Sequence, residues 1–382
     1  MPSGLLPLAL LSGALGMLAS PARAQLPYEP LAAEALPARP TAHWVWVNDI
    51  TFFNMTDGKA TLVDADAGRL LGMLSTGYNF NGVVLPRQAG LIYSPETYYS
   101  RGTRGTRTDV VTLYDAVHLQ PVGEIEIPPK RSSNMPMLSN AVLTDDDRFL
   151  LLYNFTPAQS VTVVDMRSRK FVGEVETPGC ALVYPTGART FFSVCGDGAL
   201  LDVTLDEHGA AAHSARSQPL FDVLKDPLTE KAVRSKSTWW FASFEGGVYP
   251  IESAAQGVRL AGTWSLFSAA ELAAHWRTGG LQHLALYARG QRLYAIVHQG
   301  GTETHKDPGT EVWVYDLATH RRVQRIAMRN KTGSIQVSQD AKPLLYASFI
   351  ESGTLDVYDA MSGAYLRSVE GVAQTPTTLV IP

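Results

Sequence analysis

The stretch VTLYDAVHLQPVGEI, residues 111–125, contains two short apolar runs separated by Asp115 and a polar turn. Similar phrases occur at residues 60–74, 161–175, 311–326 and 354–369. Alternating runs of aliphatic residues and tyrosine are typical of β-strands, and a short acidic side chain can cap a tight turn by accepting bonds from backbone N–H groups two residues on. The chain therefore repeats a strand, a turn and a strand.

The spacing of the aspartates that end the first strand of each phrase gives the length of the repeat. These residues are Asp64, Asp115, Asp165, Asp316 and Asp359. The first three are spaced by 51 and 50 residues, and the last two by 43. The middle interval of 151 residues has room for three such steps, and two weaker copies lie in it, near Asp202 and near Glu252. Seven units result.

Each unit also has an upstream half that reads strand, polar turn, strand. It is clearest at residues 140–155, 180–195, 283–298 and 334–349. Two hairpins make a four-stranded sheet, and repeats of this length with four strands are the signature of a propeller blade. We predict an all-β fold, a seven-bladed β-propeller of four-stranded antiparallel blades, over residues 43–382. A pair of β-sandwiches is the alternative, but it would need no fixed period.

One segment has a helical pattern. The sequence WSLFSAAELAAHWRTGG, residues 264–280, offers Ser265 or Ser268 as a start signal and Gly279 with Gly280 as a stop. We predict a short helix there, in an insertion between blades.

The first 24 residues differ from the rest. An apolar run broken by Pro7 and glycines ends in Ala22-Arg23-Ala24, a small-x-small pattern typical of signal-peptidase cleavage. We predict a cleaved export signal at residues 1–24 and a lead-in segment at residues 25–42. A membrane anchor is the alternative, but the run is shorter than the ~20 residues that a span needs.

The bulk composition excludes some partners. The formal charge is −4 and the pI is about 6.1, so no general positive field attracts nucleic acid or anionic lipid, and we expect neither nucleic acid nor a membrane as a partner. The chain has two cysteines, Cys180 and Cys195. In an exported protein this pair favours a disulfide, whereas a four-ligand zinc site or a redox C-x-x-C motif does not fit.

A search for catalytic motifs returns little. The chain has no H-E-x-x-H, no G-x-S-x-G and no phosphate-binding loop. His298 and His305 flank a Gly- and Thr-rich loop, where Glu303 and Asp307 are the acidic residues near enough to complete a metal site, and we interpret the histidines as polar loop residues.

Two surface features could bind a partner. Arg101, Arg104 and Arg107 lie within seven residues. They could bind an anion or an acidic partner, or they could belong to an exposed hairpin connection in which they pair with local acidic residues. Trp44, Trp46, Phe52 and Phe53 form an aromatic cluster, with the tryptophans in the strand at residues 43–47 and the phenylalanines after it on a loop or blade rim. Core packing is the default interpretation of this cluster. Exposed aromatic residues on a rim often mark a ligand or partner surface.

Several longer stretches carry a family resemblance. They are residues 47–53, 68–74, 100–115, 179–180 with 195–198, 264–280, 304–316 and 337–347. In this order they resemble the heavy (large) subunit of the periplasmic quinoprotein amine dehydrogenases, the methylamine and aromatic amine dehydrogenases. The resemblance runs from about residue 43 to the end of the chain.

The resemblance implies a fold, a disulfide and a site. The family's heavy subunit is a seven-bladed propeller, in agreement with the count above, and Cys180 and Cys195 match its disulfide. A phenylalanine in the loop after Val47-Asn48-Asp49 helps to select the amine at the mouth of the partner's active site. Phe53 matches it by register, with Phe52 as the alternative, so we predict both as substrate-channel residues.

The family's chemistry places the reaction on another chain. It is the oxidative deamination of a primary amine to an aldehyde and ammonia, with electrons passed to a blue copper protein of the amicyanin or azurin type. The cofactor, tryptophan tryptophylquinone, belongs to a small, cysteine-rich light subunit, and two cysteines cannot supply that subunit's disulfide framework. We therefore expect no catalytic, cofactor-binding or metal-binding residue here.

The resemblance also implies an assembly and a location. We expect a periplasmic heterotetramer of two heavy and two light chains. The sequence has features of both the methylamine and the aromatic amine branches, so it leaves the substrate open. A stand-alone propeller that acts as a binding module is the alternative function, and a propeller hydrolase with a central metal is a weaker one.

Overall fold

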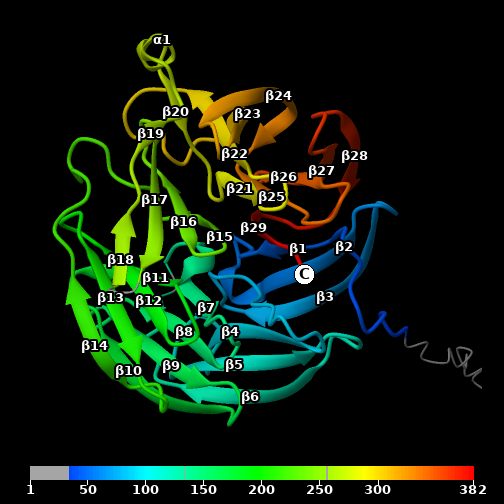
Figure 1. The fold of residues 1–382 in the computed structure, drawn as a ribbon. Helices are drawn as coiled ribbons and strands as arrows, with labels where there is room; N and C mark the ends of the chain where they lie inside the picture. The colour runs from blue at the N-terminus through cyan, green and yellow to red at the C-terminus, as the bar shows by residue number, and fades with distance from the viewer. Residues whose placement is uncertain (1–33, 133, 255–256) are drawn as a thin grey trace, which may run out of the picture. The chain divides into compact units, whose positions relative to one another are not determined.

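Residues 34–132, 134–254 and 257–382 are described by a computed structural model of the protein, and the predicted export signal lies outside them. Residues 35–382 form one compact unit. Its strands group into seven antiparallel sheets arranged around a ring, which is the predicted seven-bladed β-propeller (Figure 1). Within the described ranges, no helix is long and apolar enough to cross a membrane.

Blades follow one another in chain order. The strands of the first four sheets are β1 (Trp44–Asp49), β2 (Gly58–Asp64), β3 (Arg69–Gly77), β4 (Leu91–Tyr99), β5 (Arg107–Asp115), β6 (Pro121–Ile127), β7 (Ala141–Leu143), β8 (Phe149–Asn154), β9 (Ser160–Asp165), β10 (Lys170–Glu176), β11 (Cys180–Pro185), β12 (Thr190–Cys195), β13 (Leu200–Leu205) and β14 (Ala211–Arg216). Two 3-10 turns, at Met55–Asp57 and Leu138–Asn140, precede β2 and β7.

The remaining strands build the last three blades and close the first. They are β15 (Val233–Ser235), β16 (Thr238–Ala242), β17 (Gly247–Ala254), β18 (Gly257–Leu260), β19 (Trp264–Ser265), β20 (Trp276–Thr278), β21 (Leu284–Tyr287), β22 (Arg292–Gln299), β23 (Gly309–Asp316), β24 (Arg321–Thr332), β25 (Ser334–Val337), β26 (Leu344–Phe349), β27 (Ser352–Asp359), β28 (Tyr365–Glu370) and β29 (Pro376–Val380). The helix α1 (Ala269–Ala273) lies between β19 and β20.

The ring is closed by the two ends of the chain. β29, the last strand, is hydrogen-bonded to β1, with Trp46 opposite Val380 and Val47 opposite Leu379. β1 then pairs with β2, and β2 with β3, so the first sheet takes its inner strand from the C-terminus (Figure 1).

The second sheet departs from four regular strands. β4, β5 and β6 are regular, but the inner edge is an irregular segment that pairs with β4 at Tyr78 and at Val84. A turn interrupts this segment, because Asn79 Oδ1 accepts hydrogen bonds from the N–H groups of Asn81 and Gly82 at 2.9 and 3.0 Å, and Gly82 has a φ of 78°.

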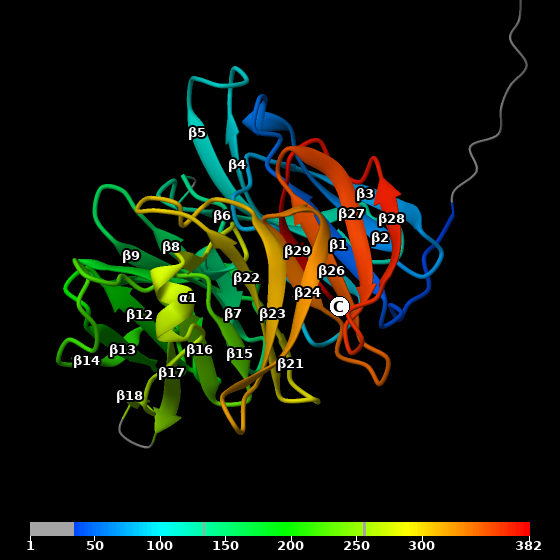
Figure 2. The ribbon, with the colours of Figure 1, turned by 90° about the horizontal axis from the view of Figure 1, so that it is seen from above.

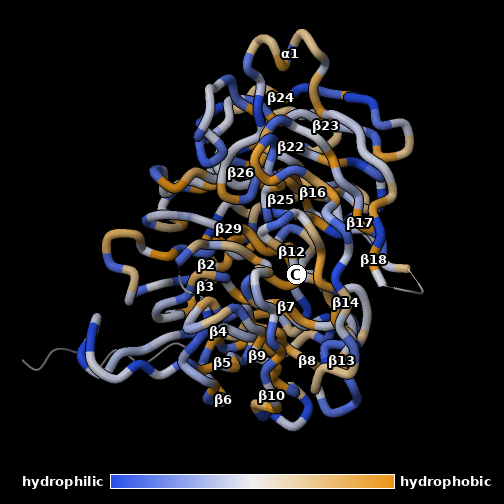
Figure 3. The backbone as a smooth tube through the Cα atoms, turned by 90° about the vertical axis from the view of Figure 1, so that its left-hand side faces the viewer, coloured by the Kyte–Doolittle hydropathy of each residue, from blue (hydrophilic) through white to orange (hydrophobic). Residues whose placement is uncertain are grey.

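Apolar side chains fill every interface between neighbouring blades. Because side chains alternate along a strand, Trp44 and Trp46 of β1 pack against the second blade while Val45 and Val47 pack against the seventh. The same alternation supplies clusters at the other interfaces. Figure 3 shows the apolar segments within the strands and polar segments at the turns.

The repeated aspartates cap the turns as predicted. In five units the aspartate Oδ1 accepts hydrogen bonds from the backbone N–H groups two and three residues on, at 2.6–3.1 Å. In the fourth unit the capping residue is Asp206, because Asp202 lies inside β13. Glu252 lies inside β17, and the turn that follows includes residues outside the described ranges.

The predicted disulfide is confirmed, since Cys180 and Cys195 are bonded and join β11 to β12. The predicted helix is confirmed at its start, where Ser268 caps α1. Its predicted end at Gly279 and Gly280 is wrong. His275 has a φ of 61°, which is incompatible with a continuing helix, and the next residues form β20, which pairs with β22.

The turn of the seventh blade gives a stability prediction. Asp359→Ala removes both capping bonds and should lower the free energy of unfolding by about 1 kcal/mol. Asp359→Asn keeps an acceptor oxygen and should cost less. The Ser362 N–H bond is the largest cause that holds the pKa of the Asp359 carboxyl below its usual value. The charged form therefore stabilises the fold above the unfolded pKa of about 3.9, and this contribution is lost as the pH falls through the lower folded pKa.

Urea unfolding of the three proteins at about pH 7 and in steps down to about pH 2 measures both effects, because the charge contribution is lost only below about pH 3.9. The stability difference between the wild type and Asp359→Asn should shrink in acid. Equal losses for the Ala and Asn variants at neutral pH would contradict the capping role.

Candidate functional site

Two adjacent phenylalanines project from the loop between β1 and β2. Phe52 is 54% exposed and Phe53 is 84% exposed, and their ring centroids are 5.6 Å apart at right angles. The loop lies beyond the end of β1, so the predicted position on a blade rim is confirmed. Large apolar side chains held in solvent mark a surface that is covered in some other state.

One buried carboxylate anchors this loop. Asp49 is 3% exposed, and its Oδ1 accepts hydrogen bonds from the N–H of Thr51 at 2.7 Å and from the N–H and hydroxyl of Thr375 at 3.1 and 2.7 Å. Its Oδ2 accepts a bond from the N–H of Gln374 at 2.6 Å. Thr375 Oγ1 in turn accepts a bond from the N–H of Phe52 at 2.8 Å. The loop is therefore fixed to the residues that immediately precede β29.

The hairpin between β4 and β5 rises beside this loop, and Figure 2 shows both on the same side of the ring. Its tip is a tight turn in which the Arg101 N–H donates to the Arg104 carbonyl at 3.0 Å. Gly102 and Gly105 have φ values of 72° and 101°, which the turn requires. Arg101 and Arg104 are exposed, and within the described part of the chain neither forms an ion pair.

The third arginine of the run has a local partner. Arg107 donates through Nε and Nη2 to both oxygens of Asp109, at 2.8 and 2.7 Å, and Asp109 is fully buried. The same carboxylate accepts the Arg131 N–H at 3.3 Å. Arg131 is 3% exposed and donates to the Thr97 hydroxyl at 2.9 Å and to the Tyr78 carbonyl. Burial lowers the pKa of Arg131 to about 10, so it stays charged at neutral pH.

A second buried carboxylate lies in the same blade. Glu96 is fully buried and accepts hydrogen bonds from the hydroxyls of Tyr98 and Thr112, both at 2.6 Å, and from Tyr114 at 3.0 Å. Burial raises the pKa of Glu96. The base of the hairpin is thus built on polar groups that satisfy one another.

The loop between β1 and β2, which carries Phe52 and Phe53, is called the phenylalanine loop below. An open hollow of about 320 Å³ separates it from the β4–β5 hairpin. Its wall includes Phe52, Phe53, Met55, Tyr78, Tyr99 and Thr103. No charged side chain lines it within the described ranges. Aromatic rings and a thioether offer contact surface for an apolar group. The structure therefore brings together the phenylalanine pair and the arginine run, which the sequence gave no reason to join.

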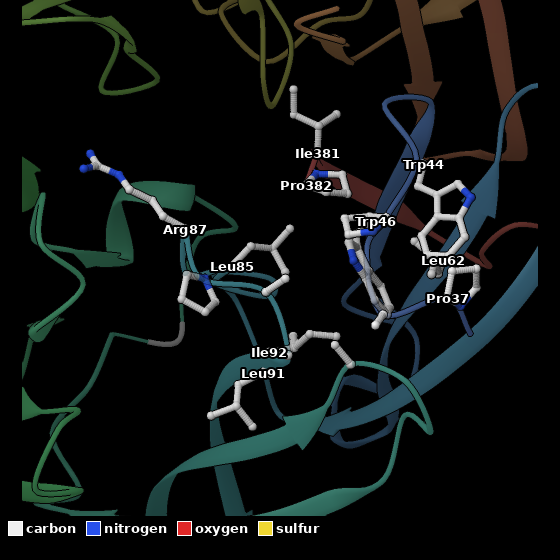
Figure 4. Close-up of a pocket in the computed structure, with 16 residues that line it drawn as sticks. Pro37, Trp44, Trp46, Leu62, Leu85, Arg87, Leu91, Ile92, Ile381 and Pro382 are labelled. Atoms are coloured by element: carbon white, nitrogen blue, oxygen red, sulfur yellow. The ribbon is translucent and has the colours of Figure 1, made fainter. Parts of the chain in front are cut away.

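A second hollow, of about 250 Å³, lies near the opposite ends of the first strands (Figure 4). Trp44, Trp46 and Ile92 line it, and Arg87 points away from it. Both tryptophans are buried, which confirms their interpretation as packing residues. Among the described residues, its wall contains no histidine, aspartate or glutamate side chain.

The two histidines that flank the Gly- and Thr-rich loop lie in separate surroundings. His298 is 6% exposed, its Nε2 is 2.9 Å from the Thr304 hydroxyl, and burial lowers its pKa. His305 packs edge-on against Phe244. Among the described residues, no group of three or more His, Cys, Asp or Glu side chains could hold a metal ion.

Comparison with known proteins assigns the family. The family profile described as methylamine dehydrogenase heavy chain (MADH) matches residues 41–381. The chain belongs to this family. The methylamine dehydrogenase heavy chain of Methylophilus methylotrophus is 32% identical over 343 residues, covering 88% of this chain and 83% of that protein. The one from Paracoccus versutus is 31% identical over 350 residues, covering 91% and 81%.

Solved structures agree on the fold of this heavy-chain family member. A functionally unknown protein from Desulfotomaculum acetoxidans superposes with a TM-score of 0.61 at 11% identity, covering 89% of this chain and 98% of that one. The β-propeller domain of Cps50 from Myceliophteria thermophila gives a TM-score of 0.58 at 11% identity, with 88% and 100% covered. At such identities the likeness concerns the fold alone.

Some residues of this heavy chain's site escaped the sequence analysis. Tyr78 and Tyr99 line the hollow, but Tyr78 lies in the irregular segment after β3 and Tyr99 ends β4, so no local pattern pairs them. Glu96 was detectable, because a carboxylate in the middle of the apolar strand β4 is unusual and calls for a buried partner. Arg131 gave no such signal, since it stands in a Pro- and Ser-rich loop.

The anchor of the phenylalanine loop can be tested at Thr375. Thr375→Val removes the hydroxyl that accepts the Phe52 N–H and donates to Asp49, and it should speed amide hydrogen exchange at Phe52 by about fivefold, since one net hydrogen bond contributes about 1 kcal/mol. Thr375→Ser keeps the hydroxyl and is the matched control. Equal exchange rates at Phe52 in the Val and Ser variants would show that this bond does not hold the loop.

Proposed function

We propose that this chain is the non-catalytic heavy subunit of a periplasmic amine dehydrogenase that converts primary amines to aldehydes and ammonia. A light subunit would carry tryptophan tryptophylquinone, two heavy and two light chains would assemble, and a blue copper protein of the amicyanin or azurin type would accept the electrons. Membership of the methylamine dehydrogenase heavy chain family supports the assignment to an amine dehydrogenase.

Trp276 and Trp313, whose rings pack together, do not fit a quinone cofactor, which supports its placement on the partner. Trp276 and Trp313 have ring centroids 4.8 Å apart, but Trp313 has no exposed surface that an amine could reach. Its Nε1 donates to Glu311 at 2.6 Å, and the Arg325 guanidinium lies 4.9 Å from its ring centroid. These contacts are those of a packed core residue.

The observation that carries the proposal is the exposed phenylalanine pair on an anchored loop. An apolar side chain that is 84% exposed gains stability when a partner covers it. A loop that is merely mobile would need no buried carboxylate, whereas Asp49 accepts four hydrogen bonds to hold this one. In this proposal, Phe53 would form one wall of a channel on a docked light subunit.

The residues of this chain would shape the substrate path rather than react. When bound in the partner, the quinone supplies the electron acceptor for the amine. Phe52 and Phe53 would exclude water from the channel mouth, which keeps proton transfer to the partner's base from being diverted to solvent. The uncharged hollow beside them would receive the apolar part of an amine.

Co-purification tests the assembly. Co-expression of this chain with an amine dehydrogenase light subunit should yield a complex of both chains that absorbs visible light through its quinone and reduces a blue copper protein when a primary amine is added. A colourless chain that purifies alone under these conditions would favour the stand-alone binding module instead.

The channel role predicts a change of selectivity at Phe53. In the assembled complex, Phe53→Ala should change the ratio of kcat/KM for methylamine and 2-phenylethylamine by about tenfold to two-hundredfold, the range for reshaping an apolar pocket. Phe171→Ala removes another exposed phenylalanine, on β10 of the third blade, and should leave the ratio unchanged. An unchanged ratio in Phe53→Ala, with a change in Phe52→Ala, would move the role to Phe52.

A further inference from the structure

Among the described residues, the wall of the hollow has no charged side chain, but the residues around it carry more positive than negative charge. Asp57 is paired with Lys59 at 2.9 Å, and Arg107 is paired with Asp109 at 2.7 Å. Arg101 and Arg104 have no such partner in the described ranges, and both stand within two residues of Thr103, which lines the hollow. Their Cα atoms therefore lie at most about 7 Å from that of Thr103. The rim carries two positive charges that no local acid offsets.

The interior behind the hollow also contains arginines. The Arg107 guanidinium is paired with both oxygens of Asp109, whereas Arg131 gives Asp109 only its backbone N–H and directs its guanidinium to the Thr97 hydroxyl and the Tyr78 carbonyl. Both arginines act on the Tyr78 hydroxyl, a group of the hollow wall, where their charges favour the ionised form against the stronger effect of burial. Glu96 is the nearby acid in this interior; it accepts hydrogen bonds from three hydroxyl groups, and burial raises its pKa. The excess positive charge is therefore counted on the two rim arginines alone.

We propose that Arg101 and Arg104 select against primary amines with a second positive charge, so that the substrates are monoamines with an uncharged tail. This inference rests on the proposed function, because it concerns the tail of the amine whose head reacts on the partner. An uncharged tail would contact the aromatic wall of the hollow, whereas a second ammonium group would be repelled by the positive charges of Arg101 and Arg104. The arginines act as specificity-determining residues and do not contact the reacting atoms.

The size of the effect follows from Coulomb's law. At about 10 Å in water, one unit charge changes the affinity of another by about twofold, so two arginines change it by about fourfold. At an ionic strength of about 0.15 M the Debye length is about 8 Å, which reduces the effect to about twofold or less. The discrimination should therefore be largest at low salt.

The test compares two amines of equal chain length in the assembled complex. For n-butylamine and 1,4-diaminobutane, kcat/KM is measured in the wild type and in the double variant Arg101→Gln with Arg104→Gln, at low and at high ionic strength. At low salt the double variant should raise kcat/KM for the diamine relative to the monoamine by about fourfold. At high salt the gain should fall below about twofold.

The matched control removes the same net charge elsewhere. Arg169→Gln with Arg321→Gln changes two exposed arginines that follow the capped turns at Asp165 and Asp316, at the opposite ends of the blades. This control should leave the diamine-to-monoamine ratio at its wild-type value.

An unchanged ratio in the hairpin variant would overturn the inference, as would an equal change in the control or a gain that does not depend on salt. Each of these results leaves the proposed function intact, because the complex still oxidises n-butylamine. A complex that oxidises no primary amine would refute the proposed function itself.

Discussion

The hydrogen bonding of β29 to β1 is the interaction on which the rest of the structure depends. It joins residues 330 positions apart, and it turns seven sheets with open ends into a ring in which every blade has two neighbours. Side chains hold the closing strand from both sides. Gln282 of the sixth blade bonds both the N–H and the carbonyl of Leu379, at 2.8 and 3.1 Å, and Asn48 donates to the strand's backbone at 3.2 Å.

The closure also organises the candidate site. Thr375, which leads into β29, bonds Asp49 at the end of β1 and the backbone of the phenylalanine loop. The loop therefore takes its position from both ends of the chain at once. A buried carboxylate with four donors is costly to desolvate and resists displacement once its bonds are made, so this anchor sets the loop more firmly than surface contacts would.

Regular and irregular parts of the fold lie at opposite ends of the strands. Aspartate-capped turns repeat at one end. There each aspartate bonds the backbone N–H groups of its own turn, so few of its acceptor positions remain for a ligand. At the other end β1 leads into the loop that carries Phe52 and Phe53, and β4 leads into the β4–β5 hairpin that carries Arg101 and Arg104, here called the arginine hairpin (Figure 2). Beneath the hairpin, the buried Asp109 is paired with the Arg107 guanidinium and accepts the Arg131 backbone N–H, in place of the apolar packing seen elsewhere. Such a buried ion pair contributes little net stability, but it restricts the direction in which the hairpin leaves the blade.

The sequence alone determined the blade count, the turn aspartates of five units, the disulfide and the loop position of Phe52 and Phe53, because each follows from local alternation, turn chemistry or a match to a family. The structure showed that both phenylalanines are exposed rather than packed in the core. The sequence pattern predicted too long a helix after Ser268. In the structure the helix ends before His275, which has a left-handed backbone, and the residues after it pair as β20 with β22. Only the tertiary structure decided that the phenylalanine loop, the arginine hairpin and the residue Tyr78 surround one hollow. That arrangement depends on which strands become neighbours when the ring closes, and such contacts between distant residues leave no periodic trace in the sequence.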